Sequence, residues 1–403
     1  MAEYGLRASL DNVTEGVVDF GGQCYPDGRA SDPCALGWMR GVPPPADKLV
    51  TLEGGTAWAF PQLRWSLSHM RELRPTVNVS RGRGAPSPLD RNDKSTDIDA
   101  LTFADADGRT HRFDEALFET YTDGIVVLHR GHIVYERYFG ALESHLPHSC
   151  QSISKSYTGT LAAALVHEGV LDEWKMIPYY VPELRGTGWE DATMRQVMDM
   201  QTGLSHPEDQ TKGAEAYGLR YDYLRTVRKQ GAHGVFSYMT VNTDVLAWVL
   251  ARVTGHSFAR LLHERLWVPL GCEEDGYIEI DPAGMPRVGS GLNATLRDLA
   301  RFGELMRCEG ASNGKQLIPA SVVYDFQKGD HPAKLQLPFG YTYRSQWWVS
   351  HNDLDALEAR GMHGQRLYVA PKAEMVIARF ASHPAVDPII EAQMLAVGRA
   401  LRA

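Results

Sequence analysis

The chain has 403 residues, of which 43% are hydrophobic and 23% charged, and a formal net charge of −9. This composition is that of an ordinary soluble protein, and the length allows one large domain or two medium ones. The acidic balance, without a cluster of lysine and arginine between aromatic residues, excludes nucleic acid and anionic membranes as expected partners.

The five cysteines are scattered and form no Cys-x-x-Cys pair, which favours reduced thiols over a disulfide framework or a zinc site. The first residues lack the basic and apolar regions of a signal peptide. No apolar run approaches the roughly 20 residues that a membrane-spanning helix needs. We therefore expect a cytoplasmic protein without a membrane partner.

The first part of the chain carries few regular patterns. Residues 1–55 are rich in glycine, proline and aspartate, so we expect an extended arm laid over a domain. A helix is predicted around Leu63–Leu73. The segment Asp105–Gly108 begins like a calcium loop but has no glutamate at the twelfth position, which favours a plain turn. Strand patterns at Gly124–His129 and Ile133–Tyr135 predict a hairpin, whose two histidines have no third ligand nearby, so no metal site is expected.

Helical patterns dominate from about residue 152 to 307. The clearest helices are predicted at Met194–Met200, at Asn242–Leu250 and, after a capping-box variant at Thr295–Asp298, through Met306. Strand patterns return near the C-terminus, at Gln346–Val349, Arg366–Val369 and Met375–Phe380. A last helix is predicted to start at Asp387-Pro388, an N-cap followed by proline.

Strands at both ends of the chain with helices between them predict an α/β (α+β) fold, with an antiparallel sheet flanked by helices. The expected division is an α/β lobe of residues 56–170 and 290–403 and an inserted all-helical lobe of residues 171–289. A catalytic cleft is expected where the two lobes meet.

The segment Cys150–Gly159 holds a Ser-x-x-Lys spacing where a polar loop gives way to helix. If Ser152 opens that helix, Ser152 and Lys155 lie one turn apart on the same face, near the free amides of the first turn. A serine hydroxyl needs an adjacent base to become a nucleophile, and a lysine can be that base. The alternative is that Ser152 is an ordinary helix cap.

A second Ser-x-x-Lys, at Ser312–Lys315, shows that the spacing alone decides nothing. Its central Asn-Gly favours a tight turn, so we predict a surface turn there. A third catalytic group is also required, to give a proton to the leaving group. Tyr238, just before a predicted helix, is the best candidate, and the alternative for it is an aromatic residue packed in the core. The α/β-hydrolase motif Gly-x-Ser-x-Gly does not occur.

Around these residues the chain resembles the serine β-lactamase and penicillin-binding superfamily, in its class C and esterase-like branch, and within that branch the nylon-oligomer (6-aminohexanoate-dimer) hydrolases. The resemblance is carried, in the same order along the chain, by Trp58–Phe60, Thr120–Asp123, Ser152–Ser156, Tyr179–Leu184, Asp199–Gln201, Asn242–Trp248, Arg297–Arg301, Gln346–Trp348 and His363–Gln365. It implies a β-lactamase-like fold and hydrolysis without a metal or organic cofactor.

The resemblance also implies roles. Ser152 would be the acylated nucleophile, Lys155 the group that lowers its proton affinity, and Tyr238 the group that passes the proton to the leaving amine and later activates water. The family's Lys-Thr-Gly motif falls on Ala359-Arg360-Gly361, where only the glycine is kept. Gly361 would let substrate approach the strand, and the backbone amides of Ser152 and Met362 would form the oxyanion hole.

Departures from the family pattern concern the substrate. The lysine and threonine of that motif, which usually bind the carboxylate of a β-lactam, are absent, and this counts against penicillin as the substrate. Arg360 either replaces the missing positive charge or is a solvated strand residue. Thr240 stands where β-lactamases carry asparagine. The substrate-binding candidates are Gly361, Thr240, Trp348, Glu208, Asp209 and Gln210. An acid for a substrate ammonium would come from Glu208, Asp209, Glu215 or Asp222, each of which is otherwise a solvated loop charge.

Three functions follow as hypotheses. The first is an acyl-enzyme amidohydrolase for linear amides or lactams such as ω-amino acid oligomers. The second is a carboxylesterase for short-chain esters with the same machinery, with β-lactamase or D-aminopeptidase activity less favoured. The third is a catalytically silent binding protein. A small molecule is the expected partner, and a homodimer is compatible with the sequence.

Overall fold

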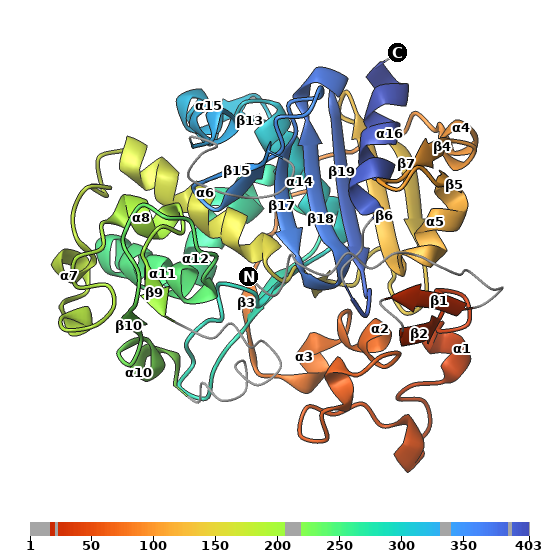
Figure 1. Ribbon diagram of the computed structural model, residues 1–403, viewed down its shortest axis with the longest axis horizontal. Helices are drawn as coiled ribbons and strands as arrows, with labels where there is room; N and C mark the ends of the chain where they lie inside the picture. The colour runs from red at the N-terminus through yellow and green to blue at the C-terminus, as the bar shows by residue number, and fades with distance from the viewer. Residues whose placement is uncertain (1–16, 21–22, 206–218, 331–339, 386–388, 403) are drawn as a thin grey trace.

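In the computed structural model, the described residues are 17–20, 23–205, 219–330, 340–385 and 389–402 (Figure 1). Their centre is a seven-stranded antiparallel sheet with the order β15-β16-β17-β18-β19-β6-β7. Two strands, β6 (Thr122–His129) and β7 (His132–Tyr138), come from the first half of the chain. The other five come from its end: β15 (Thr342–Arg344), β16 (Trp347–Val349), β17 (Leu357–Gly361), β18 (Gln365–Ala370) and β19 (Met375–Ala381).

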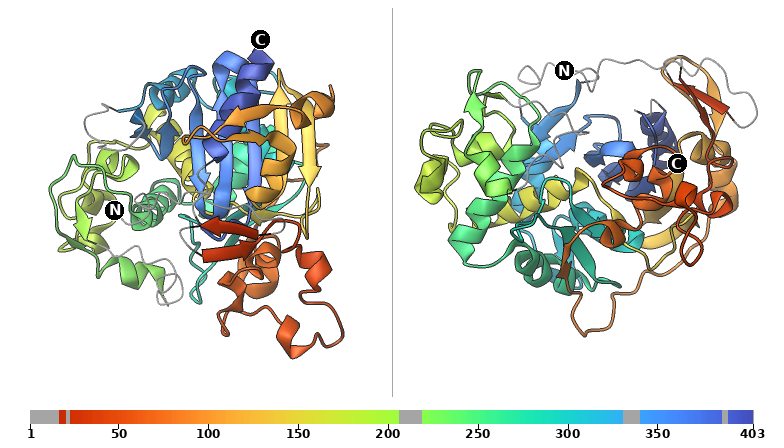
Figure 2. Two further views of the ribbon diagram at one scale, coloured as in Figure 1. Left: turned by 45° about the vertical axis from the view of Figure 1, so that its right-hand side comes forward. Right: turned by 90° about the horizontal axis from the view of Figure 1, so that it is seen from below.

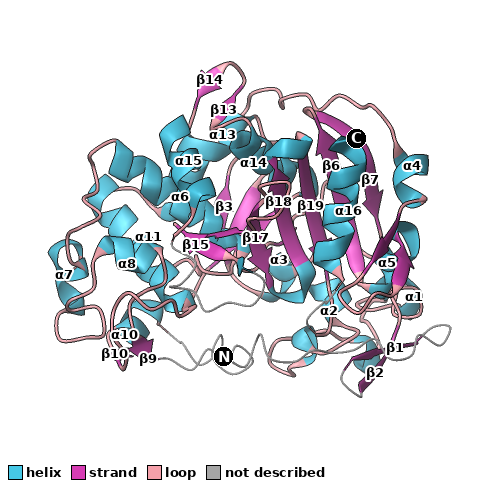
Figure 3. Ribbon diagram, turned by 45° about the horizontal axis from the view of Figure 1, so that its top comes forward, coloured by secondary structure: helices cyan, strands magenta, loops and turns pink. Residues whose placement is uncertain are grey.

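The sheet is apolar on both faces because side chains alternate along each strand. In β6, Val126 and Leu128 belong to one core, while Ile125 and Val127 belong to another on the opposite face. The helix α14 (Leu296–Arg307) covers the first face, and the helices α5 (Phe113–Glu119) and α16 (Ile390–Arg402) cover the second (Figures 1 and 3). This arrangement confirms the predicted antiparallel sheet flanked by helices.

The described helices between residues 153 and 270 lie beside the sheet, on the left of Figure 1. The longest, α6 (Ile153–His167) and α11 (Thr240–Thr254), pack against each other. Around them lie α7 (Ile177–Tyr180), α8 (Met194–Met198), α10 (Arg220–Leu224), α12 (Phe258–Leu262) and α13 (Val268–Leu270), with the short strands β9 (Leu204–Ser205) and β10 (Arg228–Lys229).

A second, four-stranded sheet has the order β3-β11-β12-β8. It joins β3 (Thr76–Val79), β11 (Gly276–Glu279), β12 (Leu292–Ala294) and β8 (His148–Ser149). The sequence predicts a boundary between the two lobes at residue 289, and the strands of this sheet lie on both sides of it in the chain. The division into lobes stays a prediction. Because β8 ends three residues before Ser152, this sheet fixes where the α6 helix begins.

Several predicted elements are confirmed. The hairpin is β6–β7, the helix with the capping residue Thr295 is α14, and Asp105 closes a plain turn between β4 (Thr102–Ala104) and β5 (Thr110–Arg112). The segment Ser312–Lys315 is the turn of the hairpin β13 (Ala311–Ser312) and β14 (Lys315–Gln316). The remaining short helices are α4 (Ser95–Asp99) and α15 (Ala320–Lys328). The predicted helix start at Asp387-Pro388 lies outside the described residues.

The prediction of one continuous helix over residues 63–73 is wrong, because the structure has two short helices there: α2 (Leu63–Ser66) and α3 (Met70–Leu73). Between them, Ser68 Oγ donates to the Trp65 carbonyl at 3.2 Å, and His69 Nδ1 lies 2.9 Å from the same oxygen. Side chains that bond to a nearby carbonyl compete with the next helical amide, so the helix stops there.

The N-terminal segment is more folded than an extended arm. Its described part forms the hairpin β1 (Val17–Phe20) and β2 (Gln23–Pro26) and the helix α1 (Pro33–Leu36), below the large sheet in Figures 1 and 2. Trp38 and Val50 pack with Ala57 and Trp65 in a small apolar cluster, which joins the later part of this segment to the residues that follow it. No helix in the described ranges is long and apolar enough to cross a membrane.

Candidate active site

Ser152 stands at the first turn of α6 with its hydroxyl unused by the helix. It is the N-cap residue, yet its side chain makes no capping hydrogen bond in the described structure. The neighbouring Ser154 instead donates its hydroxyl to the Gln151 carbonyl at 2.6 Å and accepts from the Leu292 amide at 3.2 Å. Gln151 has a φ of 47°, a conformation that non-glycine residues rarely adopt. The ordinary-cap interpretation of Ser152 therefore fails, because its oxygen points to another partner.

That partner is Lys155. Its Nζ donates to Ser152 Oγ at 2.8 Å and to the Gly289 carbonyl at 2.8 Å. The lysine is only 1% exposed, so protein atoms take the place of water around its amine. The one-turn spacing along α6 brings the two side chains together, as the sequence predicts.

Tyr238 reaches the same place from a different part of the chain. It lies two residues before α11, and Lys155 Nζ is 4.9 Å from the centroid of its ring. The ring also stacks on Trp348 from β16, with centroids 5.8 Å apart and an interplanar angle of 22°. Tyr238 is half-buried rather than enclosed, so it belongs to the wall of a site and not to the interior of the core.

The three predicted side chains thus meet where the helices adjoin the large sheet. The wall behind Tyr238 is apolar and is formed by Met200, Phe236, Met239, Tyr343 and Trp348. The two sides of the site are joined by Gln346: its side-chain oxygen accepts from Thr243 Oγ1 at 2.8 Å, and its carbonyl accepts from Ser156 Oγ at 2.7 Å. Gln346 and Thr243 are therefore structural residues of this junction.

The end of β17 lies directly against the segment before Ser152. A Cβ on Gly361 would be 2.7 Å from the Cys150 carbonyl oxygen and 3.0 Å from Gln151 Cβ, so only glycine allows this approach. Met362 follows, which brings its amide to this end of the strand. In the first turn of α6, the amides of Ile153, Ser154 and Lys155 donate to the carbonyls of residues 150, 151 and 152. The Ser152 amide makes no such bond in the described structure and can serve a ligand.

The predicted substrate-binding residues have different outcomes. Trp348 is in the site wall, and Thr240 is the first residue of α11. Glu208, Asp209, Gln210 and Glu215 lie outside the described residues. Asp222 forms a surface ion pair with Arg225 at 3.2 Å, both side chains being about half exposed (61% and 47%).

Arg360 is neither a solvated strand residue nor a free charge for a substrate. Its guanidinium donates to Glu358 at 2.7 Å and to Glu391 at 3.3 Å, and it lies 4.1 Å from the centroid of the Tyr341 ring. Alternation along the strand places residues 358 and 360 on the same face, and α16 supplies the second carboxylate. Both sequence interpretations of Arg360 are therefore wrong, because its charge is already paired.

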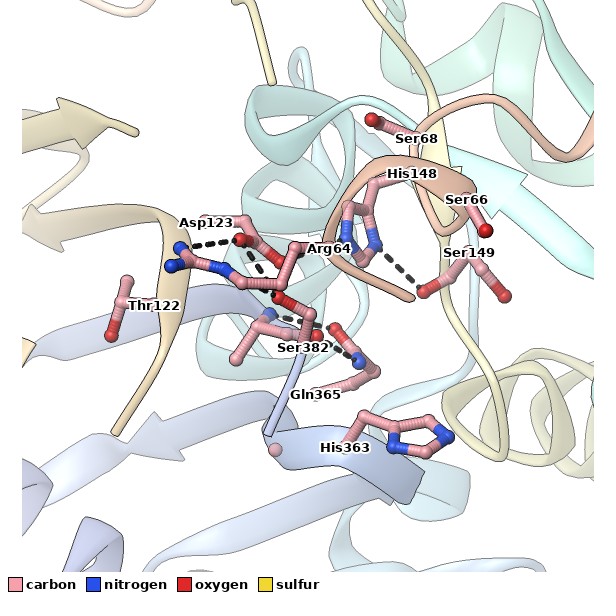
Figure 4. Close-up of polar contacts among 12 residues, drawn as sticks. Arg64, Ser66, Ser68, Thr122, Asp123, His148, Ser149, His363, Gln365 and Ser382 are labelled. Atoms are coloured by element: carbon pink, nitrogen blue, oxygen red, sulfur yellow. Dashed lines mark hydrogen bonds and ion pairs between the residues drawn. The ribbon is translucent and has the colours of Figure 1, made fainter. Parts of the chain in front are cut away.

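A buried polar cluster, to which no sequence pattern assigned a role, surrounds Asp123 (Figure 4). Asp123 of β6 accepts hydrogen bonds from Arg64 at 3.2 Å and Ser382 Oγ at 3.0 Å, and lies 3.4 Å from His148 Nε2. Burial raises the pKa of Asp123, but the neighbouring His148 and the charge of Arg64 outweigh it and hold the pKa below its usual range.

This Asp123 cluster supports the segment that carries Ser152, because His148 lies four residues before it in β8. His363, just after Met362, is half-buried, and loss of water around its ring lowers its pKa. Its Nδ1 lies 2.9 Å from the His383 carbonyl oxygen. The signal for these residues was present: Asp123 and His363 stand in segments that carry the family resemblance, but nothing local indicated their partners. Among the described residues, no group of three or more His, Cys, Asp or Glu could hold a metal ion.

A family model described as β-lactamase matches residues 115–393, which is more than half of the chain and includes all three converging side chains. The chain therefore belongs to the β-lactamase family and is a hydrolase of the β-lactamase and penicillin-binding superfamily, which confirms the resemblance and the predicted fold.

Among its relatives is the 6-aminohexanoate-dimer hydrolase of Paenarthrobacter ureafaciens, 32% identical over 351 residues, which span 81% of this chain and 87% of the relative. A solved structure described as a candidate 6-aminohexanoate-dimer hydrolase from Bacillus anthracis is 32% identical, with a TM-score of 0.80 over 86% of this chain and 96% of the other. A family VIII carboxylesterase, 17% identical, shares the fold with a TM-score of 0.57 over 79% and 99% of the two chains.

Proposed function

We propose that this hydrolase cleaves linear amide bonds through a covalent acyl-enzyme formed on Ser152. The observation that carries the proposal is the bond of 2.8 Å between Lys155 Nζ and Ser152 Oγ, with the ring of Tyr238 against the same amine. A nucleophile in hydrogen-bond contact with a base, next to a third ionisable group, is the arrangement that acyl transfer requires.

In the proposed reaction the hydroxyl proton of Ser152 passes to the neutral amine of Lys155 as Oγ bonds to the substrate carbonyl carbon. The oxyanion that forms accepts hydrogen bonds from the Ser152 and Met362 amides. When the C–N bond breaks, Tyr238 gives its proton to the leaving amine, and the acyl group stays on Ser152. Water then gives a proton to the Tyr238 phenolate and attacks the acyl carbon. As the bond to Ser152 Oγ breaks, Lys155 returns its proton to Oγ and the acid leaves.

The substrate proposed is an oligomer of an ω-amino acid. Two relatives that bear the name 6-aminohexanoate-dimer hydrolase, each about one third identical, support this class. The partly exposed Phe236 and Met239, at the surface of the apolar wall behind Tyr238, suit a run of methylene groups better than a charged or heavily hydroxylated chain. With the charge of Arg360 already paired, a β-lactam carboxylate lacks an obvious cation on β17.

Ester hydrolysis is the second candidate, because the Ser152–Lys155 contact serves either kind of acyl donor. An ester needs less help from a proton donor, since an alkoxide leaves more easily than an amide anion. The two candidates therefore share acylation and differ in their dependence on Tyr238.

The direct test is intact-protein mass spectrometry after incubation with linear amides, lactams and short nitrophenyl esters. The expected result is a mass gain equal to one acyl group on the wild type and none on Ser152→Ala. Wild-type protein that gives no adduct with any acyl donor or with a fluorophosphonate probe would instead support the silent binding protein.

A further inference from the structure

The amine of Lys155 has a second anchor besides Ser152, the carbonyl of Gly289, 134 residues away in the sequence. This carbonyl belongs to a tight turn before β12, in which the amides of Ser290 and Gly291 donate to the Arg287 carbonyl at 3.3 and 2.7 Å. The turn fixes the direction of the Gly289 carbonyl. Whatever holds residue 289 in place therefore also sets the position of the lysine amine.

Gly289 is pressed against the start of α11. A Cβ at this position would lie 2.5 Å from Thr240 Cγ2, closer than real Cβ atoms come, and 3.2 Å from the Thr240 carbonyl oxygen, which is also a tight contact. Tyr238 lies two residues before α11. The contact between Gly289 and Thr240 therefore also links the position of the Lys155 amine to that of the Tyr238 phenol.

Asp244, one turn into α11, holds Gly289 at this contact. Its Oδ1 accepts the Gly289 amide at 3.4 Å, and its Oδ2 accepts from Arg220 Nη2 at 2.8 Å. The carboxylate is buried, with 5% of the residue exposed. Arg220 is itself fixed, since its backbone amide donates to the carboxylate of Asp281 at 2.8 Å.

We infer that Asp244 is a positioning residue for the lysine: it holds Gly289 against α11 so that the Gly289 carbonyl keeps Lys155 Nζ in contact with Ser152 Oγ. The inference rests on the proposed function, because it assumes that Lys155 activates Ser152. Asp244 touches neither Lys155 nor Ser152 directly. The competing explanation is that Asp244 serves the stability of the fold alone, through Arg220.

The experiment compares acylation rates per active site for wild type and Asp244→Asn. A burst of nitrophenolate from a nitrophenyl ester counts the competent sites, so a loss of folded protein lowers the burst amplitude but not the rate per site. We expect the rate of acylation per site to fall about 10- to 100-fold, the size of effect that a small misplacement of a reacting group produces. The ester concentration that gives half of the maximal acylation rate should stay within about twofold, because the inference gives Asp244 no role in substrate binding.

Asp298 of α14 provides a matched control. Its carboxylate is as well buried, with 1% of the residue exposed, and it likewise accepts a backbone amide, that of Glu273 at 2.7 Å, and an arginine, Arg301 at 3.1 Å. Asp298→Asn should lower the melting temperature and leave the rate per site unchanged. An Asp244→Asn rate per site equal to that of wild type, or an equal loss in Asp298→Asn, would overturn the inference.

A second variant moves the carbonyl without touching a charge. Gly289→Ala forces its new Cβ into Thr240 Cγ2, so the rate per site should fall at least as far as in Asp244→Asn. Adding Thr240→Ser removes that methyl group and should recover part of the rate, measured against Thr240→Ser alone. No recovery would count against the inference. Turnover that survives in Ser152→Ala and Lys155→Ala would instead overturn the proposed function.

Discussion

The chain carries the Ser-x-x-Lys spacing twice, and the two copies differ in almost everything except the spacing. Ser152 and Lys155 lie one turn apart on α6, whereas Ser312 and Lys315 face each other across the hairpin β13–β14. In both places the two side chains are neighbours, since cross-strand partners are as close as residues one helical turn apart. Proximity of a serine and a lysine is therefore not what defines the site.

The difference lies in what surrounds the lysine. Lys315 is exposed, in a turn where Asn313 and Gly314 have φ values of 50° and 71°. Lys155 is buried and has two further neighbours from distant parts of the chain, the carbonyl of Gly289 and the ring of Tyr238. The amine of Lys315 is surrounded by water, whereas the amine of Lys155 is held in place by protein atoms that replace the water.

The largest expected contrast is between Ser152→Ala and Ser312→Ala. The first should lower kcat by about six orders of magnitude if the three groups act as a unit, and the second should leave it unchanged. Steady-state assays on a linear amide, at equal concentrations of folded protein, measure both. Comparable losses in the two variants would mean that the α6 pair is not special.

Tyr238→Phe sharpens the comparison by removing the third group, which the hairpin pair does not possess in the described structure. Loss of a proton donor should slow amide cleavage by about 10²–10⁴-fold and ester cleavage much less. Paired kcat/KM measurements on an amide and an ester with the same acyl group test this. An equal fall for both substrates would show that Tyr238 does not protonate the leaving group.

Gly361→Ala changes the approach of β17 to the nucleophile. The new Cβ would meet the Cys150 carbonyl at 2.7 Å, so the strand end and the Met362 amide must shift. Loss of one oxyanion donor costs about 10²–10³ in kcat, and we expect a fall of that size. The matched control is Gly314→Ala in the hairpin, where the Cβ meets open space but φ is positive. It should cost a little stability and no activity.

Asp123→Asn should have the smallest effect on turnover per folded molecule and a clear effect on stability. Removing one partner of a buried ion pair costs about 3–5 kcal/mol, whereas Lys315→Ala at the exposed hairpin should change the free energy of unfolding by less than about 0.5 kcal/mol. Urea unfolding at neutral pH, monitored by tryptophan fluorescence, measures both. Equal midpoints for the two variants would argue against a supporting role for the Asp123 cluster.

The same aspartate gives a pH dependence of defined sign. Its pKa in the folded protein is lower than the ordinary 3.8, so its contribution to stability is complete above about pH 4 to 5 and is lost as the pH falls through the folded pKa. The stability difference between wild type and Asp123→Asn should therefore shrink on acidification in that window. A stability difference that grows as the pH falls would show that folding raises the pKa of Asp123 instead of lowering it.

Local patterns in the sequence determined the elements that depend on neighbouring residues. Two strand-forming runs on either side of the turn Arg130–His132 defined the β6–β7 hairpin, and the Thr295 cap defined the start of α14. Helix formers after Ser152 placed it one turn from Lys155. Tyr238 could be chosen only because the segments around it resemble a known family. The helix break at Ser68 and His69 was missed because their bonds to the Trp65 carbonyl override the apolar pattern.

Only the tertiary structure decided the contacts that make the serine–lysine pair a site. The Gly289 carbonyl is 134 residues from Lys155 in the chain, and Arg64 and Asp123 are 59 residues apart. Arg360 is paired with a glutamate from α16, which no pattern within β17 reveals. Burial and long-range pairing depend on how whole helices and strands pack. A short sequence motif therefore indicates which side chains are present, but not which of them are buried away from water.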